Sequence, residues 1–450
     1  MKRKNSVEAE KLNQRKRMKV KVIGAGLAGC EAAYALATRG VQVDLYEMKP
    51  LKRSPAHHTD LFAELVCSNS LKAARIDSAA GLLKEEMRRL GSISMIAAER
   101  SSVAAGGALA VDRDTFSQII TDEIKNHSNI TVHYEEVGEI NPDEITIICS
   151  GPLTDGPLAE KIKQLTNSDN LSFFDAAAPI VTAESIDMSH AFCASRYDKG
   201  GDDYINCPMN KAEYEAFYEA LMSAERAPQK DFDVNGRVYE GCMPIEIMAQ
   251  RGADTMRFGP LKPVGLRDPA TGHRPWANLQ LRRENQEGTL FNLVGFQTNL
   301  KFAEQKRVFS MIPALANAEF VRYGVMHRNS FINSPKLLNR DQSLKKYPNI
   351  YFAGQITGVE GYMESASSGI LAGINVYLRL KGEKSLSLPN YTMLGALNGY
   401  ITDESIKDFQ PMGANFGVLP SIEPHIRDKK ERYSALSNRS LLWYNNLMIK

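Results

Sequence analysis

The sequence lacks several features that would place it in particular classes of protein. It has no apolar run long enough to span a bilayer, no signal-peptide core after its first residues, no Gly/Ser-rich or Pro-rich linker and no internal repeat. We therefore expect a cytoplasmic protein without a membrane contact. At 450 residues, with 43% hydrophobic and 24% charged residues, the chain has the composition of a globular enzyme of two or three domains.

Cysteine is present, but not in patterns that bind a metal or form a disulfide framework. None of the six cysteines belongs to a CxxC pair or a zinc-like spacing, so no metal site is expected. Cys30 in a predicted helix and Cys149 in the apolar stretch TIICSG should lie in the core. Cys67 in ELVCSNSL and Cys242 in YEGCMPIE are expected on loops, where a thiol is accessible enough to react. The residues alone leave a structural role for these two open.

The net charge of +2 does not by itself indicate a polyanionic partner, but positive residues gather in two places. Residues 1–17 form a basic arm, which is an RNA contact, a solvated tail, or a segment ahead of a natural start at Met18. The middle of the chain is also basic, which indicates either a solvated face or a groove for RNA phosphate or a folate glutamate tail. Its basic residues are Arg251, Arg257, Lys262, Arg267, Arg274, Arg282, Arg283, Lys301, Lys306 and Arg307.

A glycine-rich turn joins a predicted strand, 18–23, to a predicted helix, 30–38. Its glycines have the spacing of a dinucleotide-binding fingerprint and are Gly24, Gly26 and Gly29. In such a turn the glycines allow a tight bend, close approach of a pyrophosphate, and close packing of the helix on the strand. A second predicted strand, 41–46, ends at Glu47, whose carboxylate would bind a ribose hydroxyl.

NAD and FAD both fit this first element, and a second glycine-rich element near the C-terminus favours FAD. A short strand at 351–353 precedes a tight turn and a helix of small residues over 362–380, which can direct its N-terminus at the same cofactor. The residues of this element that we expect at the cofactor are Gly354, Gln355 and Gly361. Such a returning unit is similar to that of flavoproteins of the glutathione-reductase type.

The predicted fold class is α/β, with a discontinuous Rossmann-like FAD-binding domain and an inserted α+β domain. The first part of the nucleotide domain covers 18–151, and the second part with a C-terminal tail covers 348–450. The insertion, 152–347, is expected to recognise the substrates, because ligands of open α/β sheets lie beyond the carboxyl ends of the strands.

A set of longer strings lies between residues 65 and 417, within a resemblance that runs from about residue 18 to the C-terminus. In chain order they are LVCSNSL, GGALAVDR, DAAAPIV, SRYDKG, YEGCMPIE, RFGPLKPVGL, LVGFQTNLKFAEQKRVF, VRYGVMHRN, AGQITGVEGYMESA and FQPMGANFG. On these strings the chain closely resembles the folate- and FAD-dependent tRNA uracil-5 methyltransferases, which are related to the GidA flavoproteins.

The resemblance implies an enzyme that methylates C5 of a uridine in RNA, in this family the T-loop uridine at position 54 of tRNA. It implies 5,10-methylenetetrahydrofolate as carbon donor, reduced FAD as carrier and reductant, and NAD(P)H as the source of electrons. By family match, the Cys242 thiolate would add to C6 of the uracil, and Cys67 would take the C5 proton. A cation beside these thiols would favour their ionised form, and the candidates are Arg251, Arg257 and Lys262.

The target base must leave its stack to reach the flavin, which favours RNA contact by the basic insertion, with Arg282 and Arg283 among the RNA or folate candidates. Two positions depart from the family pattern: Asn299 stands where histidine is usual, and Gly413 where asparagine is usual. If that histidine stacks on the folate pterin, Asn299 offers a smaller, non-aromatic face. The alternatives are the same chemistry on 23S ribosomal RNA, modification of a wobble uridine, and RNA binding without chemistry. No obligate protein partner is indicated.

Overall fold

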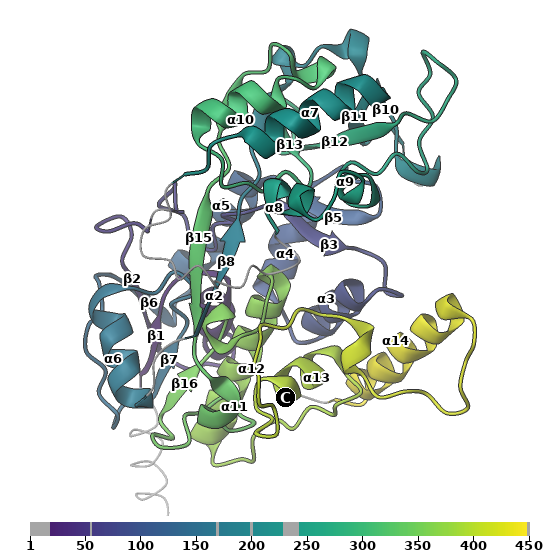
Figure 1. The fold of residues 1–450 in the computed structure, drawn as a ribbon. Coiled ribbons are helices and arrows are strands. Elements are labelled where there is room, and N and C mark those ends of the chain that lie inside the picture. Colours follow the sequence, from purple (N-terminus) through teal and green to yellow (C-terminus); the bar gives the residue numbers. More distant parts are fainter. Residues whose placement is uncertain (1–18, 55, 168–170, 199–200, 228–242, 448–450) are drawn as a thin grey trace, which may run out of the picture.

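The computed structural model describes residues 19–54, 56–167, 171–198, 201–227 and 243–447. The chain forms two lobes, one around a parallel sheet and one around an antiparallel sheet (Figure 1). The basic arm, 1–17, and Cys242 lie outside the described residues.

The first lobe contains a five-stranded parallel sheet in the order β16-β7-β1-β2-β6. Its strands are β1 (Val20–Ile23), β2 (Val43–Glu47), β6 (Ile130–Tyr134), β7 (Thr146–Ile148) and β16 (Ile350–Phe352). The strand β16 pairs with β7, although the whole insertion separates them in the chain. The predicted α/β class, with a discontinuous Rossmann-like sheet, is therefore confirmed.

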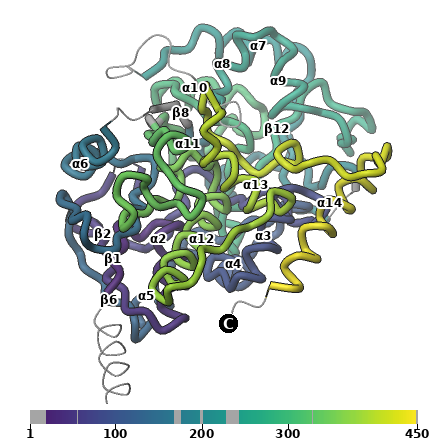
Figure 2. The backbone as a smooth tube through the Cα atoms, turned by 90° about the horizontal axis from the view of Figure 1, so that it is seen from below, coloured from purple at the N-terminus to yellow at the C-terminus, as the bar shows by residue number. Residues whose placement is uncertain are grey.

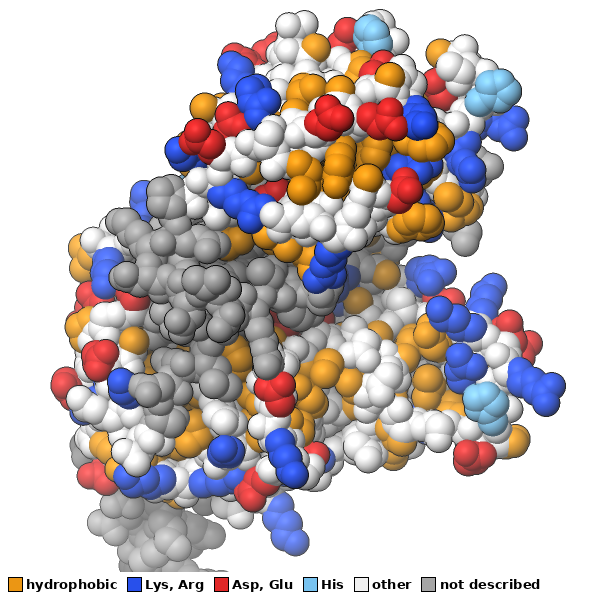
Figure 3. Space-filling model, viewed as in Figure 1, with side chains coloured by type: hydrophobic (Ala, Val, Ile, Leu, Met, Phe, Trp, Pro, Cys, Tyr) orange, Lys and Arg blue, Asp and Glu red, His pale blue; other side chains and the backbone are white. Residues whose placement is uncertain are grey.

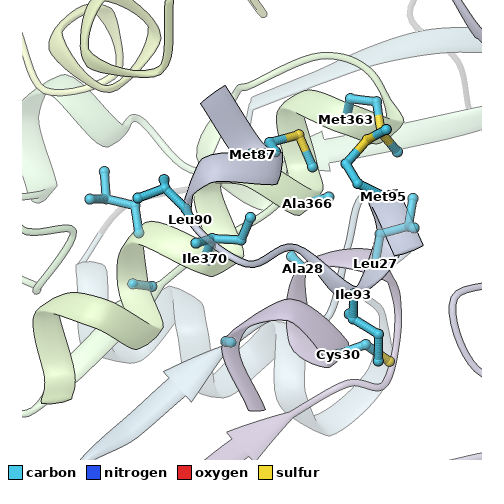
Figure 4. Close-up of a cluster of buried hydrophobic side chains, with 14 of the residues drawn as sticks. Leu27, Ala28, Cys30, Met87, Leu90, Ile93, Met95, Met363, Ala366 and Ile370 are labelled. Carbon is cyan, nitrogen blue, oxygen red and sulfur yellow. The ribbon is translucent and has the colours of Figure 1, made fainter. Parts of the chain in front are cut away.

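Helices cover one face of this sheet and meet in a single core (Figure 4). Among the side chains in that core are Leu27, Met87, Ile93 and Ile370, each from a different segment of the chain, and Cys30 is buried beside them, as predicted. The helices are α2 (Leu27–Ala37), α3 (Ala79–Arg89), α4 (Ile93–Arg100), α5 (Arg113–Asn126), α12 (Tyr362–Lys381), α13 (Met393–Tyr400) and α14 (Lys429–Asn445). Burial of such an apolar face is the main stabilising contribution to the lobe.

The other face of the sheet carries α6 (Gly156–Thr166) and α11 (Ser334–Leu337). Ile162 of α6 and Ile332, which precedes α11, share a core with Ile148 and Phe352 of the sheet. Side chains from outside the predicted boundaries at 151 and 348 therefore pack on the parallel sheet, and the boundaries themselves stay a prediction.

The second lobe is built on a six-stranded antiparallel sheet in the order β10-β11-β12-β13-β9-β14. Its strands are β9 (Ile180–Thr182), β10 (Phe192–Cys193), β11 (Tyr204–Met209), β12 (Ala277–Arg283), β13 (Leu290–Leu293) and β14 (Phe320–Arg322). Its helices are α7 (Lys211–Ser223), α8 (Ile245–Gln250), α9 (Thr255–Phe258) and α10 (Phe302–Phe309).

Two smaller sheets lie where the lobes meet (Figure 1). The antiparallel pair β8 (Leu171–Ala176) and β15 (Met326–Phe331) carries the chain out to the insertion and back. The sheet β3-β5-β4 contains β3 (Ser70–Ala73), β4 (Ser102–Val103) and β5 (Ala108–Val111). The strand β3 begins just after Cys67, so this sheet fixes one end of the cysteine loop.

The C-terminal helix α14 lies beside α3, as seen from below in Figure 2. A buried carboxylate joins them: Glu86 accepts hydrogen bonds from Met393 N at 2.7 Å, Leu394 N at 2.8 Å and the Ser440 hydroxyl at 2.5 Å. Burial raises the pKa of Glu86 from 4.5 to about 7. The C-terminal segment is therefore a fixed layer of the first lobe.

Candidate active site

The turn between β1 and α2 forms one wall of a deep cleft. Gly24 has a φ of +96°, and a Cβ there would lie 2.6 Å from the carbonyl oxygen of Cys149. A Cβ at Gly29 would lie 1.8 Å from the Gly24 carbonyl oxygen. The helix can therefore approach the strand this closely only because residue 29 has no side chain. A Cβ at Gly26 would meet nothing within 4 Å. The fold therefore requires two of the glycines, while the third leaves space for a ligand at the start of a helix.

Glu47, at the end of β2, lies against this turn. One carboxylate oxygen accepts a hydrogen bond from Ala25 N at 2.8 Å, and the other accepts one from Lys49 N at 2.9 Å. The side chain is buried, with 7% of its surface exposed, and it lines the cleft. The acid is thus held in the place where the fingerprint requires a partner for a ribose hydroxyl.

The second glycine element packs directly on the first. Gly354 has a φ of +85°, its N–H donates to the Ser368 hydroxyl at 2.8 Å, and a Cβ there would lie 2.9 Å from Ala28 Cβ. A Cβ at Gly369 of α12 would lie 2.1 Å from the Ala28 carbonyl oxygen. Small residues therefore allow α12 to contact α2 at backbone distance, which brings the two helix N-termini to one site.

A cleft with an empty volume of about 1200 Å³ lies between these elements, and we call it the dinucleotide cleft. Among the residues that line it are Gly24, Gly26, Glu47, Gly354, Gln355 and Tyr362. The open space before Gly26, the tethered acid and the paired helix N-termini all fit a dinucleotide such as FAD.

A second cleft, of about 1140 Å³, adjoins the first and is here called the cysteine cleft. Residues that line it include Cys67, Lys72, Gln355, Gly361, Tyr362 and Glu364. Gln355 and Tyr362 line both clefts, so ligands in the two would be neighbours. Gly361, with a φ of +120°, is the N-cap of α12 and lines only the cysteine cleft.

The loop that carries Cys67 is held by the Tyr362 side chain. The phenolic oxygen accepts hydrogen bonds from Cys67 N at 2.7 Å and from Ser68 N at 3.1 Å. Burial, and secondarily the charge of Cys67, raises the pKa of Tyr362 well above its usual value. Tyr362 is therefore a neutral phenol at physiological pH, and it fixes the backbone at the junction of the two clefts.

Arginine side chains bind the same loop from other directions. Arg113 donates to the Leu65 carbonyl at 2.6 Å, and Arg322 donates to the Val66 carbonyl at 2.5 Å. Arg282 donates to the Ser68 hydroxyl at 2.8 Å and to Asn69 Oδ1 at 2.9 Å. These residues come from three separate parts of the chain.

The charges around this loop are mainly positive. Burial lowers the pKa of Arg282 and of Arg322, while attraction to Cys67 opposes the lowering at Arg322. The acid that pairs with this group of arginines is Glu284, which forms an ion pair with Arg113. The same attraction favours the ionised thiol of Cys67.

The cations predicted beside the catalytic thiols do not line the clefts at Cys67. Among the described residues, Arg251, Arg257 and Lys262 line neither cleft. Arg257 instead stacks on Trp276, with its guanidinium carbon 3.7 Å from the ring centre, in a separate hollow of the second lobe. Cys242 lies outside the described residues, so the assignment of these three residues as its cationic neighbours stays a prediction.

Three further residues, which the sequence predicts to contact RNA or folate, have structural contacts that the sequence did not predict. Arg282 is buried and binds the cysteine loop, so it is not part of an exposed groove. Arg283 is half-buried, and its carbonyl accepts a hydrogen bond from the Asn69 side chain at 2.9 Å. Asn299 is buried with its N–H donated to Glu246 at 2.7 Å, and it lines neither described cleft.

Sequence reasoning missed Tyr362, Arg113, Arg322, and the ion pair of Lys72 with Glu364. Lys72 Nζ lies 2.7 Å from a carboxylate oxygen of Glu364, which also accepts a hydrogen bond from Ala414 N at 2.9 Å. All of these residues except Lys72 lie within the strings that carry the family resemblance. No pattern of residue types marked them, because their partners are distant in the chain.

Within the described ranges, no group of His, Cys, Asp or Glu side chains is arranged to hold a metal ion. The helices of those ranges also include none that is long and apolar enough to cross a membrane.

The fold and the paired glycine elements define a dinucleotide-binding protein. A family model described as glucose inhibited division protein A, GidA, matches residues 19–384. Two crystal forms of Aquifex aeolicus GidA share the fold: one has a TM-score of 0.68 at 16% identity and covers 96% of this chain and 73% of that protein. The other has a TM-score of 0.67 at 16% identity and covers 94% of this chain and 76% of that protein.

Much closer relatives are named methylenetetrahydrofolate--tRNA-(uracil-5-)-methyltransferase TrmFO. The protein from Acetivibrio thermocellus is 60% identical over 94% of this chain and 97% of its own. The protein from Halalkalibacterium halodurans is 55% identical over 96% of this chain and 99% of its own. The chain therefore belongs to the GidA family and, within it, to the TrmFO proteins, which confirms the predicted resemblance.

Proposed function

We propose that this protein is a methylenetetrahydrofolate--tRNA-(uracil-5-)-methyltransferase, the activity for which its close relatives are named. FAD occupies the dinucleotide cleft, and NAD(P)H supplies the electrons. The target that we propose is the uridine of the tRNA T-loop.

The observation that carries this proposal is the position of Cys67. Tyr362 lines both clefts, and its hydroxyl holds the Cys67 backbone at 2.7 Å. A thiol at that junction is placed to act on a base in one cleft beside a cofactor in the other. The positive charges of the surrounding arginines favour its thiolate, which is the form that accepts a proton.

The proposed roles of the residues follow from the chemistry of uracil. A thiolate that adds to C6 makes C5 nucleophilic, and a base must then remove the C5 proton. We assign the addition to Cys242, which lies outside the described residues, and the proton removal to Cys67. Gly26, Glu47 and Gly354 would hold the cofactor, which when bound supplies electrons and relays the one-carbon unit.

The decisive experiment is nucleoside mass spectrometry after incubation with labelled methylenetetrahydrofolate and a nicotinamide reductant. The substrates are an unmodified tRNA transcript, a transcript lacking the T-loop uridine, and a 23S ribosomal RNA fragment. Labelled 5-methyluridine in the first transcript alone supports the proposal. Label in the ribosomal fragment, a modified anticodon nucleoside, or no label in any RNA would each overturn it.

Cysteine variants test the two assigned thiols. Cys242→Ala should retain the yellow flavin but form no covalent adduct with RNA that contains 5-fluorouridine. Cys67→Ala should retain both flavin and RNA binding and lose methylation. Cys193→Ala is the matched control, because this exposed cysteine lines neither cleft. Full activity in either of the first two variants contradicts the assignment.

A further inference from the structure

The C-terminal segment of this chain follows the residues that the GidA family model matches. The family model ends at residue 384, so α13 and α14 follow it. The TrmFO relatives match 422 residues or more, which exceeds residues 1–384 together, so their similarity extends into this segment. The close relatives therefore resemble this chain beyond the end of the family model.

The beginning of α14 carries exposed positive charge. Arg427, Lys429 and Lys430 are exposed, and none of them forms an ion pair with a described residue. Asp428 between them is the N-cap of the helix and accepts a hydrogen bond from Glu431 N at 2.8 Å. We call these three basic residues the α14 basic patch.

These charges lie at the N-terminal end of the helix. Lys429 and Lys430 are the first two residues of α14, and the acids that complement the helix dipole there are Asp428 and Glu431. The patch therefore attracts an anion through its exposed cationic side chains and not through the helix end. The arrangement thus suits a negatively charged partner.

An aromatic ring lies within the same surface. Tyr433 is half-buried and packs on Phe416, with ring centres 4.4 Å apart. The Lys429 ammonium lies 5.4 Å from the centre of the Tyr433 ring, and the Arg432 guanidinium lies 5.8 Å from it. These contacts hold the two cationic side chains beside the ring, next to the exposed lysines.

Hydrogen bonds connect this surface to the cysteine cleft. Phe416 follows Ala414, whose N–H binds Glu364 in the cleft wall. On the other side, the Ser437 hydroxyl donates to the Ile76 carbonyl at 2.8 Å, which places α14 beside the exposed Arg75. Figure 3 shows basic side chains gathered at the end of the first lobe that carries α14, across a hollow from the second lobe.

We propose that the α14 basic patch is a docking surface for the phosphate backbone of the tRNA whose uridine enters the cysteine cleft. This inference rests on the proposed function, since the partner is its substrate. Phosphate contacts fix the position of an RNA without reading its sequence. The patch would therefore orient the tRNA arm, while the base itself is selected at the clefts.

The test is binding of a fluorescein-labelled tRNA transcript to the full-length holoenzyme over a series of salt concentrations. The triple variant Arg427→Ala/Lys429→Ala/Lys430→Ala should lower the slope of log affinity against log salt by about 2–3, since each phosphate contact contributes about 0.7–0.9. Affinity at moderate salt should fall about tenfold or more. The catalytic rate at saturating tRNA should stay within about twofold, because no reacting group is changed.

A matched variant removes the same number of positive charges elsewhere. Lys346, Lys381 and Lys384 are exposed, and the first two also lie over tyrosine rings, at 5.1 Å and 5.5 Å. Their triple alanine variant should bind tRNA like the unchanged protein. Replacing Lys429 and Lys430 with arginine should preserve binding and the salt slope.

The outcomes separate this inference from the proposed function. Equal affinity and equal salt slope in the patch variant and the unchanged protein would overturn the docking surface, even if 5-methyluridine is formed. Loss of affinity in both triple variants would also overturn it, since the effect would then reflect net charge. Specific loss in the patch variant supports the surface, even if the unchanged protein forms no 5-methyluridine.

Discussion

The turn between β1 and α2 offers a sharp test, because two of its glycines are needed for different physical reasons. A Cβ at Gly29 would lie 1.8 Å from the Gly24 carbonyl oxygen, so Gly29→Ala must push α2 away from β1. A Cβ at Gly26 meets no atom within 4 Å, and its φ of −75° suits alanine. Gly29→Ala should therefore damage the fold, and Gly26→Ala should damage only the ligand site.

The expected magnitudes differ accordingly. Overpacking at Gly29 should cost about 3 kcal/mol of unfolding free energy and lower Tm by about 3 °C. Gly26→Ala changes only a helix N-cap, which costs less than about 1 kcal/mol. If the open space receives the pyrophosphate, the added methyl group should weaken FAD binding at least about tenfold, or about 1.4 kcal/mol.

The assay measures Tm of flavin-free protein and, separately, FAD affinity by titration of the flavin-free protein. Measuring Tm without FAD is necessary, because a bound ligand would itself raise the stability. Gly107→Ala is the matched control, since a Cβ there also meets nothing within 4 Å and Gly107 lines neither cleft. Unchanged FAD affinity in Gly26→Ala would refute the reasoning, as would an unchanged Tm in Gly29→Ala.

Other predictions concern buried groups. Burial raises the pKa of Glu86 from 4.5 to about 7, so its stabilising contribution, about 3 kcal/mol, is present below about pH 4.5 and is lost as the pH rises to about 7. Glu86→Gln should flatten the fall in unfolding free energy over that window, and an unaltered pH profile in denaturant titrations would contradict this. Arg322→Met should slow alkylation of Cys67 at neutral pH about tenfold, while Cys193 in the same sample serves as the reference; equal slowing at both would refute the effect. Tyr362→Phe removes the acceptor for Cys67 N and Ser68 N. It should therefore cost about 2 kcal/mol of stability and speed hydrogen exchange at the Cys67 amide. Unchanged exchange at that amide would contradict the role of Tyr362 in holding the loop.

The local elements of the dinucleotide site could be predicted from the order of residues alone. The strand, the turn with Gly24, Gly26 and Gly29, and the helix are adjacent in the chain, so hydrophobic pattern and glycine spacing specify them together. Glu47 follows at the end of the next strand. The buried positions of Cys30 and Cys149 were equally predictable, because each lies within an apolar helix or strand.

The surroundings of Cys67, in contrast, follow from contacts between distant segments of the folded chain. Its loop is bound by Arg113, Arg282, Arg322 and Tyr362, which come from four separate segments. A hydrogen bond between distant segments leaves no periodic trace in sequence, since nothing in the spacing of the residues encodes which side chain will face which carbonyl. Folding brings these charges to one loop, and their combined field is what can make an ordinary thiol reactive.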